Sequence, residues 1–159
     1  MENKRHVEEQ NYVEEVGIIF EQTGLPRMAG RILGWLIIAD PPHQSTTQLT
    51  EALIASKGSI STMTRFLIRI GLIERISLLG QRHDYFCNKI GACHQLLGDS
   101  LDQTKIFRQL MECGLELTEG KDHANRQWLE EMRDMYVFME REFPALLERF
   151  KKERTEVLK

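Results

Sequence analysis

The stretch that decides the fold is SKGSISTMTRFLIRIGLIERI, residues 56–76. Ser56 is a favourable residue for the start of a helix, and Gly71 is the residue type that most often follows a helix end. Together they predict a helix from Lys57 to Ile70. On a helical wheel, one face of this helix is apolar and is expected to pack inward, with Ile60, Met63, Leu67 and Ile70.

The opposite face of this helix has no acidic residue. It carries Gly58, Thr62, Arg65 and Arg69, with Ser61 beside them. A face that serves only solubility usually mixes the signs of its charges. Small side chains let the backbone approach another molecule closely, and arginine supplies paired donors for guanine edges or phosphates. The face therefore indicates an anionic partner.

The segments on either side extend this interpretation. Before the helix, TTQLTEALIA (46–55) predicts a short helix with Leu49, Leu53 and Ile54 inward. After it, LIERISLLGQRHDYFCNK (72–89) is rich in β-forming residues and predicts a hairpin that turns at Gly80 and carries Arg82. A support helix, a recognition helix and a hairpin wing, in that order, are typical of a winged helix-turn-helix.

Helical periodicity predicts further helices over about 3–22, 26–39, 90–117 and 122–156. The fold class is thus mainly α with a small β-hairpin. We divide the chain into an N-terminal dimerisation helix (1–24), a winged helix-turn-helix (25–89) and a C-terminal helical dimerisation region (90–159). Pro144 predicts a kink or a break near Phe143 in the last helix.

The last helix has an apolar seam with heptad-like spacing. An exposed seam of that length favours aggregation unless it meets a counterpart, so it predicts pairing with a second copy of the chain. Its residues are Met132, Tyr136, Met139, Phe143, Leu146 and Phe150.

Charge is distributed unevenly along the chain of 159 residues. The formal net charge is −3, yet residues 27–89 contain 8 Lys/Arg and 4 Asp/Glu. A basic centre between acidic ends suits a local anionic partner. The chain shows neither the apolar core of a signal peptide nor an apolar run long enough for a membrane, so a cytoplasmic protein without membrane attachment is expected.

No catalytic, cofactor or metal motif is present. The sequence lacks a Gly-rich phosphate loop, GxSxG and HExxH, and no two histidines have the i, i+4 spacing of a helical metal site. We therefore expect no enzyme activity, no cofactor and no metal.

The three cysteines, Cys87, Cys93 and Cys113, form no CxxC pair, and a redox role for them stays open. Arg27 and Arg31 are assigned equally to phosphate contacts or to internal salt bridges.

Three segments carry a family resemblance: GLPRMAGRILGWLIIADPP (24–42), residues 46–76, and GQRHDYF (80–86). They resemble the GbsR-like branch of the MarR transcriptional regulators. The resemblance implies a homodimeric DNA-binding regulator, taken here as a repressor, whose terminal helices form the dimer interface. It also implies that the helix at about 57–70 enters the major groove and that the wing at about 77–84 reaches toward the minor groove.

Transferred position by position, the resemblance gives the residues expected to contact DNA. They are Ser59, Ser61, Thr62 and Arg65 on the recognition helix and Arg82 on the wing, and the outward face adds Arg69. The implied partners are a palindromic double-stranded operator, a second copy of the chain and a small-molecule effector. The alternative is a winged helix that binds protein and has no sequence-specific DNA binding.

Overall fold

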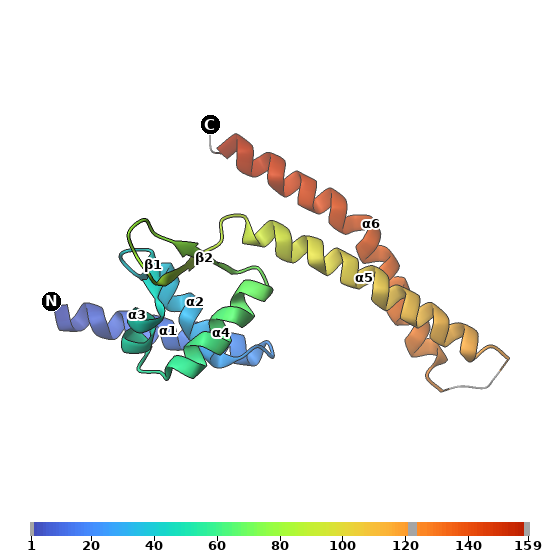
Figure 1. Cartoon of the computed structure of the whole chain (residues 1–159). Coiled ribbons are helices and arrows are strands. Elements are labelled where there is room, and N and C mark those ends of the chain that lie inside the picture. Colours follow the sequence, from blue (N-terminus) through green and yellow to red (C-terminus); the bar gives the residue numbers. More distant parts are fainter. Residues whose placement is uncertain (1, 121–123, 158–159) are drawn as a thin grey trace. The chain divides into compact units, whose positions relative to one another are not determined.

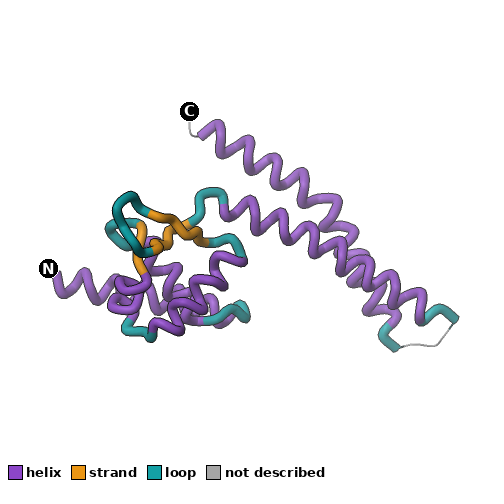
Figure 2. The backbone as a smooth tube through the Cα atoms, in the orientation of Figure 1, coloured by secondary structure: helices purple, strands orange, loops and turns teal. Residues whose placement is uncertain are grey.

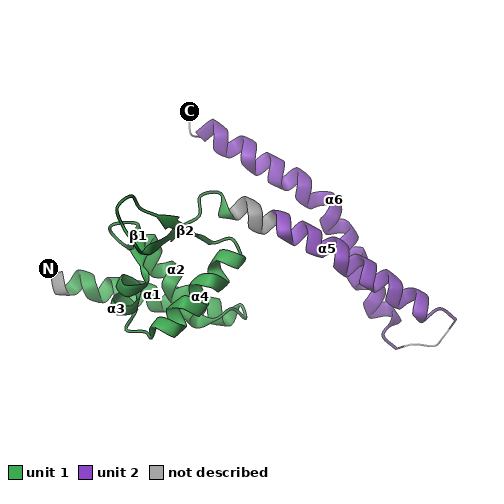
Figure 3. Cartoon of the chain, viewed as in Figure 1, with its two compact units in different colours: residues 1–92 green, residues 93–159 purple. Residues whose placement is uncertain are grey.

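The computed structural model describes the backbone of residues 2–120 and 124–157, and the side chains of residues 4–92, 98–120 and 124–157. The chain separates into two compact units, residues 1–92 and 93–159 (Figures 1 and 3). Each unit has its own internal packing.

The first unit contains four helices and all the strands of the described residues (Figure 2). The helices are α1 (Glu2–Gln22), α2 (Arg27–Ile38), α3 (Thr46–Leu53) and α4 (Lys57–Arg69), and the strands are β1 (His43–Ser45), β2 (Ile73–Ser77) and β3 (Asp84–Asn88). One apolar core joins them, formed chiefly by Val13, Ile32, Leu36, Leu49, Leu53, Ile60, Leu67 and Ile73.

The strands form an antiparallel sheet in the order β1-β3-β2. The predicted hairpin is confirmed, because β2 and β3 pair across a turn in which Gly80 has φ +79°. The sequence did not predict β1, since three residues are too few to show an alternating pattern. The mainly helical winged-helix fold class is confirmed, with a three-stranded sheet in place of an isolated hairpin.

Helices α1 and α2 cross at very short range. A Cβ placed on Gly30 of α2 would lie 2.7 Å from the Val16 carbonyl oxygen of α1, so only glycine fits at this crossing. Glu14 of α1 then pairs with both arginines of α2, 2.6 Å from Arg31 Nε and 3.1 Å from Arg27 Nη2. The contact to Arg31 Nε is an ion pair without hydrogen-bond geometry.

These ion pairs decide between the two roles left open for Arg27 and Arg31. Arg31 also donates from Nη2 to the Leu53 carbonyl oxygen at 3.1 Å, which joins α2 to the end of α3. Both arginines therefore hold helices of the first unit together, and the internal salt bridges are the better description.

One expected core residue is placed differently. Leu49 and Leu53 are buried as predicted, but Ile54 is 92% exposed. Ile54 ends α3 in a left-handed conformation with φ +49°, which turns its side chain away from the core. The prediction that Ile54 points inward was wrong because helical periodicity stops at Leu53.

The second unit is a helical hairpin of α5 (Ala92–Leu117) and α6 (Arg126–Val157). Phe107 of α5 stacks on Tyr136 of α6 with ring centroids 5.6 Å apart. Arg108 Nε donates to Glu140 at 2.8 Å, and its Nη1 donates to Glu112. These hydrogen bonds, the one to Glu140 first, raise the pKa of Arg108 above its ordinary value, so this cation is permanently charged between the two helices.

The sequence predicted a kink or a break near Phe143, and α6 continues through Pro144 without a break. Figure 1 shows the helix changing direction part-way along its course, in keeping with the other half of that prediction. No described helix is both long and apolar enough to cross a membrane.

Candidate nucleic-acid interface

Helix α4 presents a polar face because its apolar residues follow a strict helical spacing. Ile60, Thr64 and Leu67 are buried at i, i+4 and i+7. The hydroxyl of Thr64 is satisfied inside the helix, where Oγ1 donates to the Ile60 carbonyl oxygen at 2.9 Å. Ser56 caps the helix, accepting from the Ser59 amide at 3.2 Å. The remaining face is exposed and carries Ser61, Thr62, Arg65 and Arg69.

The arginines of this face have no carboxylate partner among the described residues. Arg65 Nε donates only to the Ser61 carbonyl oxygen of its own helix, at 3.2 Å. Arg69 lies over the ring of Phe66, 5.5 Å from its centroid. Arg82 at the wing likewise has no ion pair within the described part of the chain. Arg27 and Arg31, by contrast, both pair with Glu14.

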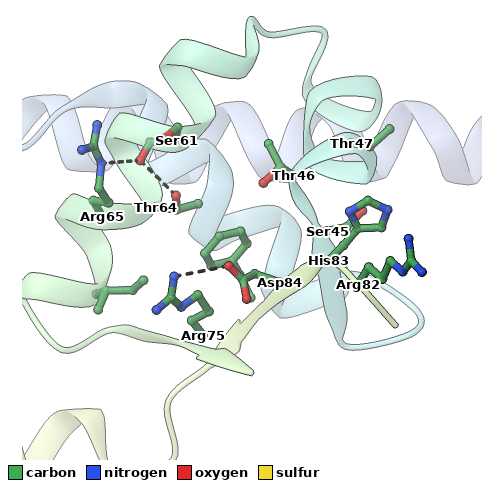
Figure 4. A pocket seen from close by; sticks show the side chains of 12 residues that line it. Ser45, Thr46, Thr47, Ser61, Thr64, Arg65, Arg75, Arg82, His83 and Asp84 are labelled. Carbon is green, nitrogen blue, oxygen red and sulfur yellow. Dashed lines mark hydrogen bonds and ion pairs between the residues drawn. The ribbon is translucent and has the colours of Figure 1, made fainter. Parts of the chain in front are cut away.

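A pocket of about 400 Å³ opens between α4, the start of α3 and the wing (Figure 4). Its lining is hydroxylated and cationic, with one described carboxylate. Strand β1 and α3 contribute Ser45, Thr46 and Thr47, α4 contributes Ser61, Thr64 and Arg65, and the wing contributes Arg75, Arg82, His83 and Asp84.

The start of α3 adds backbone donors to this pocket. Ser45 Oγ accepts from the Gln48 amide at 3.2 Å, and Gln48 Oε1 accepts from the Ser45 amide at 2.8 Å. This reciprocal cap leaves the amides of Thr46 and Thr47 at a helix N-terminus, which is favourable for an anion. The pocket therefore combines arginines, hydroxyl groups and a helix N-terminus, a set suited to phosphate.

The wing residues Arg75 and Asp84 were not predicted from the sequence. Arg75 Nη1 lies 3.2 Å from Asp84 Oδ2, across β2 and β3. Arg75 is opposite the buried Phe86, and Asp84 is two residues before Phe86, so both side chains lie on the face of the hairpin that holds the core. This period of two along the predicted hairpin was the signal that could have placed them beside Arg65.

The residues predicted to contact DNA are brought together in part. Ser61, Arg65 and Arg82 line the pocket described above. Thr62 and Arg69 lie with Arg65 along a second hollow on the outer side of α4. Ser59 is half-buried, and it lines neither of these two hollows.

Among the described side chains, the cysteines and the metal-binding residue types form no second centre. Burial, followed by the nearby Glu74 carboxylate, raises the pKa of the Cys87 thiol above its ordinary value, which disfavours the reactive thiolate. Cys113 is exposed on α5, and the side chain of Cys93 lies outside the described residues. Within the described ranges, no three His, Cys, Asp or Glu side chains gather as a metal site.

The winged helix and its basic face agree with the similarity to known proteins. The chain is 38% identical over 129 residues to the HTH-type transcriptional regulator MmpR5 of Mycobacterium tuberculosis (strain ATCC 25618 / H37Rv), covering 81% of this chain and 78% of the relative. This chain belongs to the MarR family of transcriptional regulators. Such regulators are not enzymes, as the sequence predicted.

The matching family model agrees with this MarR-family assignment. The sequence model of the MmpR5-like MarR family transcriptional regulators matches residues 91–153. A crystal structure of a transcriptional regulator has 36% sequence identity and a TM-score of 0.76, covering 91% of this chain and 99% of that one. A more distant match is a complex of Staphylococcus aureus MepR with DNA, at 18% identity and a TM-score of 0.41, covering 74% and 93% of the two chains. The family-level prediction is confirmed, and the GbsR-like branch stays a prediction.

Proposed function

We propose that this MarR-family protein binds double-stranded DNA as a homodimer and represses transcription from a palindromic operator. The observation that carries the proposal is the set of arginines without carboxylate partners, Arg65, Arg69 and Arg82, around a hydroxylated pocket on the winged helix. Arg27 and Arg31, which hold helices of the first unit together, both pair with Glu14 instead. Phosphates supply the missing negative charge.

Each predicted residue has a role in this proposal. Arg65, in the middle of the exposed face of α4, reaches a base edge in the major groove, with Ser61 and Thr62 beside it. Arg69 at the end of the helix and Arg82 on the wing bind backbone phosphates on either side. Ser59 is half-buried, so its part is to let the start of α4 approach the DNA closely.

The alternative, a winged helix that binds protein, is less well supported. A protein-binding surface normally has an apolar centre. The exposed face of α4 instead presents hydroxyl groups and arginines, and the pocket beside it is lined mostly by polar side chains. Its chemistry suits a polyanion better than an apolar protein surface.

Dimerisation is proposed from apolar side chains that the helical hairpin leaves exposed. On α5, Ile106, Leu110 and Leu117 are 57%, 56% and 69% exposed, and they share one helix face with the exposed Cys113. On α6, the predicted seam is partly used within the chain, since Tyr136 stacks on Phe107. The rest of α6 still exposes large apolar side chains: Trp128, Met135, Phe138, Leu146 and Phe150.

A second chain is the simplest cover for these side chains, because exposed apolar stripes of this length favour association. Two-fold pairing presents two α4 helices at once. Half-sites about one DNA turn apart, roughly 34 Å, then match a palindromic operator. The terminal regions 1–24 and 90–159 are the parts of the chain we assign to this interface.

A small-molecule effector belongs to the same proposal. The helical hairpin has an apolar cavity of about 240 Å³ lined by Leu101, Phe143, Leu146, Leu147 and Phe150. A compound that occupies it would act through the hairpin that carries the exposed apolar stripes. Its effect would be measured as a loss of operator affinity in the presence of the compound.

DNA binding can be tested without a known operator. Purified protein would be used to select duplexes from a random pool, and a recovered duplex would be compared with a scrambled one in a salt titration. We expect tighter binding to the recovered duplex and a linear fall of log affinity with log salt. Recovery of no preferred duplex would leave the protein-binding alternative. A promoter–reporter fusion carrying the recovered duplex then tests repression.

A further inference from the structure

We propose that Asp84 sets the DNA selectivity of the winged helix by holding Arg75 in an ion pair that phosphate must displace. This inference rests on the proposed DNA binding and adds a residue that restrains it. Asp84 is the one acidic residue among the described side chains that line the pocket, where it pairs with Arg75 while Arg65 and Arg82 line the same hollow (Figure 4). A carboxylate at that place opposes the approach of DNA.

The position of the pair follows from the wing. In the β2–β3 register, Ser77 is opposite Asp84, and Arg75 is opposite Phe86. Arg75 and Asp84 are therefore diagonal neighbours on the same face of the hairpin, the face that Phe86 anchors in the core. Their side chains meet at 3.2 Å beside α4 and not on the solvent side of the sheet.

The pair is weak enough to open. The Arg75 and Asp84 side chains are 63% and 50% exposed, and ion pairs exposed to this degree contribute little to stability. Arg75 is consequently held near the DNA-facing pocket while its charge is largely compensated. A phosphate placed in the pocket can replace Asp84 as the partner of the Arg75 guanidinium at a small cost in free energy.

Selectivity for the operator over random DNA follows because phosphate must displace Asp84 from Arg75. On a random duplex, the protein makes only phosphate contacts. A phosphate that contacts Arg75 must displace Asp84 from it. On the operator, base contacts by Arg65 fix the register of the DNA first and hold a phosphate in place beside Arg75. The ion pair thus weakens binding to random DNA more than binding to the operator.

The test compares wild type with Asp84→Asn on a recovered duplex and on a scrambled one. Asparagine keeps the shape and removes the charge. With Arg75 released, we expect the log–log salt slope on scrambled DNA to steepen by about 0.9, which is an affinity gain of about fivefold at 0.15 M salt. Affinity for the recovered duplex should rise less, so that the ratio of the two affinities falls.

The matched control is Asp102→Asn on α5. Asp102 is also an exposed aspartate in an ion pair, 3.6 Å from Lys105, but it lies in the other unit. It changes the net charge equally and should leave the affinity ratio unchanged. In an Arg75→Gln background, Asp84→Asn should lose most of its effect on the salt slope, because Asp84 acts through Arg75.

Two results would overturn the inference. If Asp84→Asn weakens both duplexes with an unchanged salt slope and a lower melting temperature, the pair only braces the wing. If both affinities rise by the same factor, Asp84 provides general repulsion and no selectivity. A wild type that selects no duplex at all is a different outcome, since it refutes the proposed DNA binding itself.

Discussion

Gly30 of α2 lies so close to Val16 of α1 that a Cβ on Gly30 would stand 2.7 Å from the Val16 carbonyl oxygen. The side chain of Phe20 would be only 2.8 Å away. Backbone cannot yield as a flexible side chain does, so any larger residue at Gly30 must push the two helices apart. The closeness of α1 and α2 therefore depends on one missing methyl group.

The first prediction is that Gly30→Ala destabilises the first unit. Overpacking of a tight contact costs typically about 1–3 kcal/mol, which would appear as a lower midpoint in thermal or denaturant unfolding. The control is Gly98→Ala in α5, where nothing lies within 4 Å of the added Cβ. Alanine there should stabilise its helix by roughly 0.5–1 kcal/mol. Equal effects of the two substitutions would contradict the close crossing.

The second prediction concerns Arg65. Arg65→Ala should weaken binding to the recovered duplex by about 1–3 kcal/mol and reduce discrimination between duplexes. The fold should be unaffected, because the side chain is exposed and its hydrogen bond among the described residues is to its own helix. Arg65→Lys is the sharper variant, since it keeps the charge and loses the paired donors. It should retain the salt slope while losing discrimination, and wild-type selectivity in both variants would remove α4 from the groove.

The third prediction concerns Arg82 on the wing. If Arg82 binds a phosphate, Arg82→Ala should weaken recovered and scrambled duplexes alike and reduce the log–log salt slope by about one. Arg154→Ala on α6 removes an equal charge far along the sequence and should leave the slope unchanged. A salt slope that Arg82→Ala does not alter would place Arg82 in solvent.

The fourth prediction tests the dimer interface. Leu110→Glu places a charge in the exposed stripe of α5 and should shift the protein toward monomer in sedimentation, with operator affinity lower by orders of magnitude. Leu110 is 56% exposed, so its replacement spares the hairpin core, unlike replacement of the half-buried Met139. The control is Gln109→Glu, which adds the same charge at the preceding residue. Gln109 is exposed but is not part of the apolar stripe, so this variant should stay dimeric. A monomeric wild type at micromolar concentration would defeat the proposal.

The fifth prediction concerns the Cys87 thiol, whose pKa is raised chiefly by burial and secondarily by Glu74. In a Cys93→Ser, Cys113→Ser background at pH 7 to 8, iodoacetamide should alkylate Cys87 far more slowly in the folded protein than in the protein unfolded in urea. The folded state favours the protonated thiol, so its contribution to stability is fully present below the ordinary thiol pKa of about 8.5 and is lost as the pH rises through the folded pKa. Cys87→Ala should reduce that alkaline loss, and rapid alkylation of Cys87 at neutral pH would contradict it.

The winged helix could be predicted in detail because its signals are local. Ser56 caps α4, and Gly71 follows its end with φ +78°, as the residue types required. The turn at Gly80 was found for the same reason. Strand β1 was missed, since its three residues gain their conformation from pairing with β3 and not from their own pattern.

The site could be predicted only on one helix face. A helical wheel shows which side of α4 is polar, and it gave Thr62, Arg65 and Arg69 correctly as exposed. It does not show which distant residues complete the surface. The ion pair of Arg75 and Asp84 depends on the β2–β3 register, and the pairing of Arg27 and Arg31 with Glu14 depends on the α1–α2 crossing. Both are long-range facts, which the sequence alone left open.

Ser45 ends β1 and, without an intervening residue, caps α3. Its backbone pairs with Tyr85 in β3, and its hydroxyl accepts from Gln48 in α3. No linker separates the sheet from the helix, so we expect a rotation of β1 and β3 to turn the start of α3 with it. Ser45 therefore ties the orientation of the start of α3 to that of the sheet.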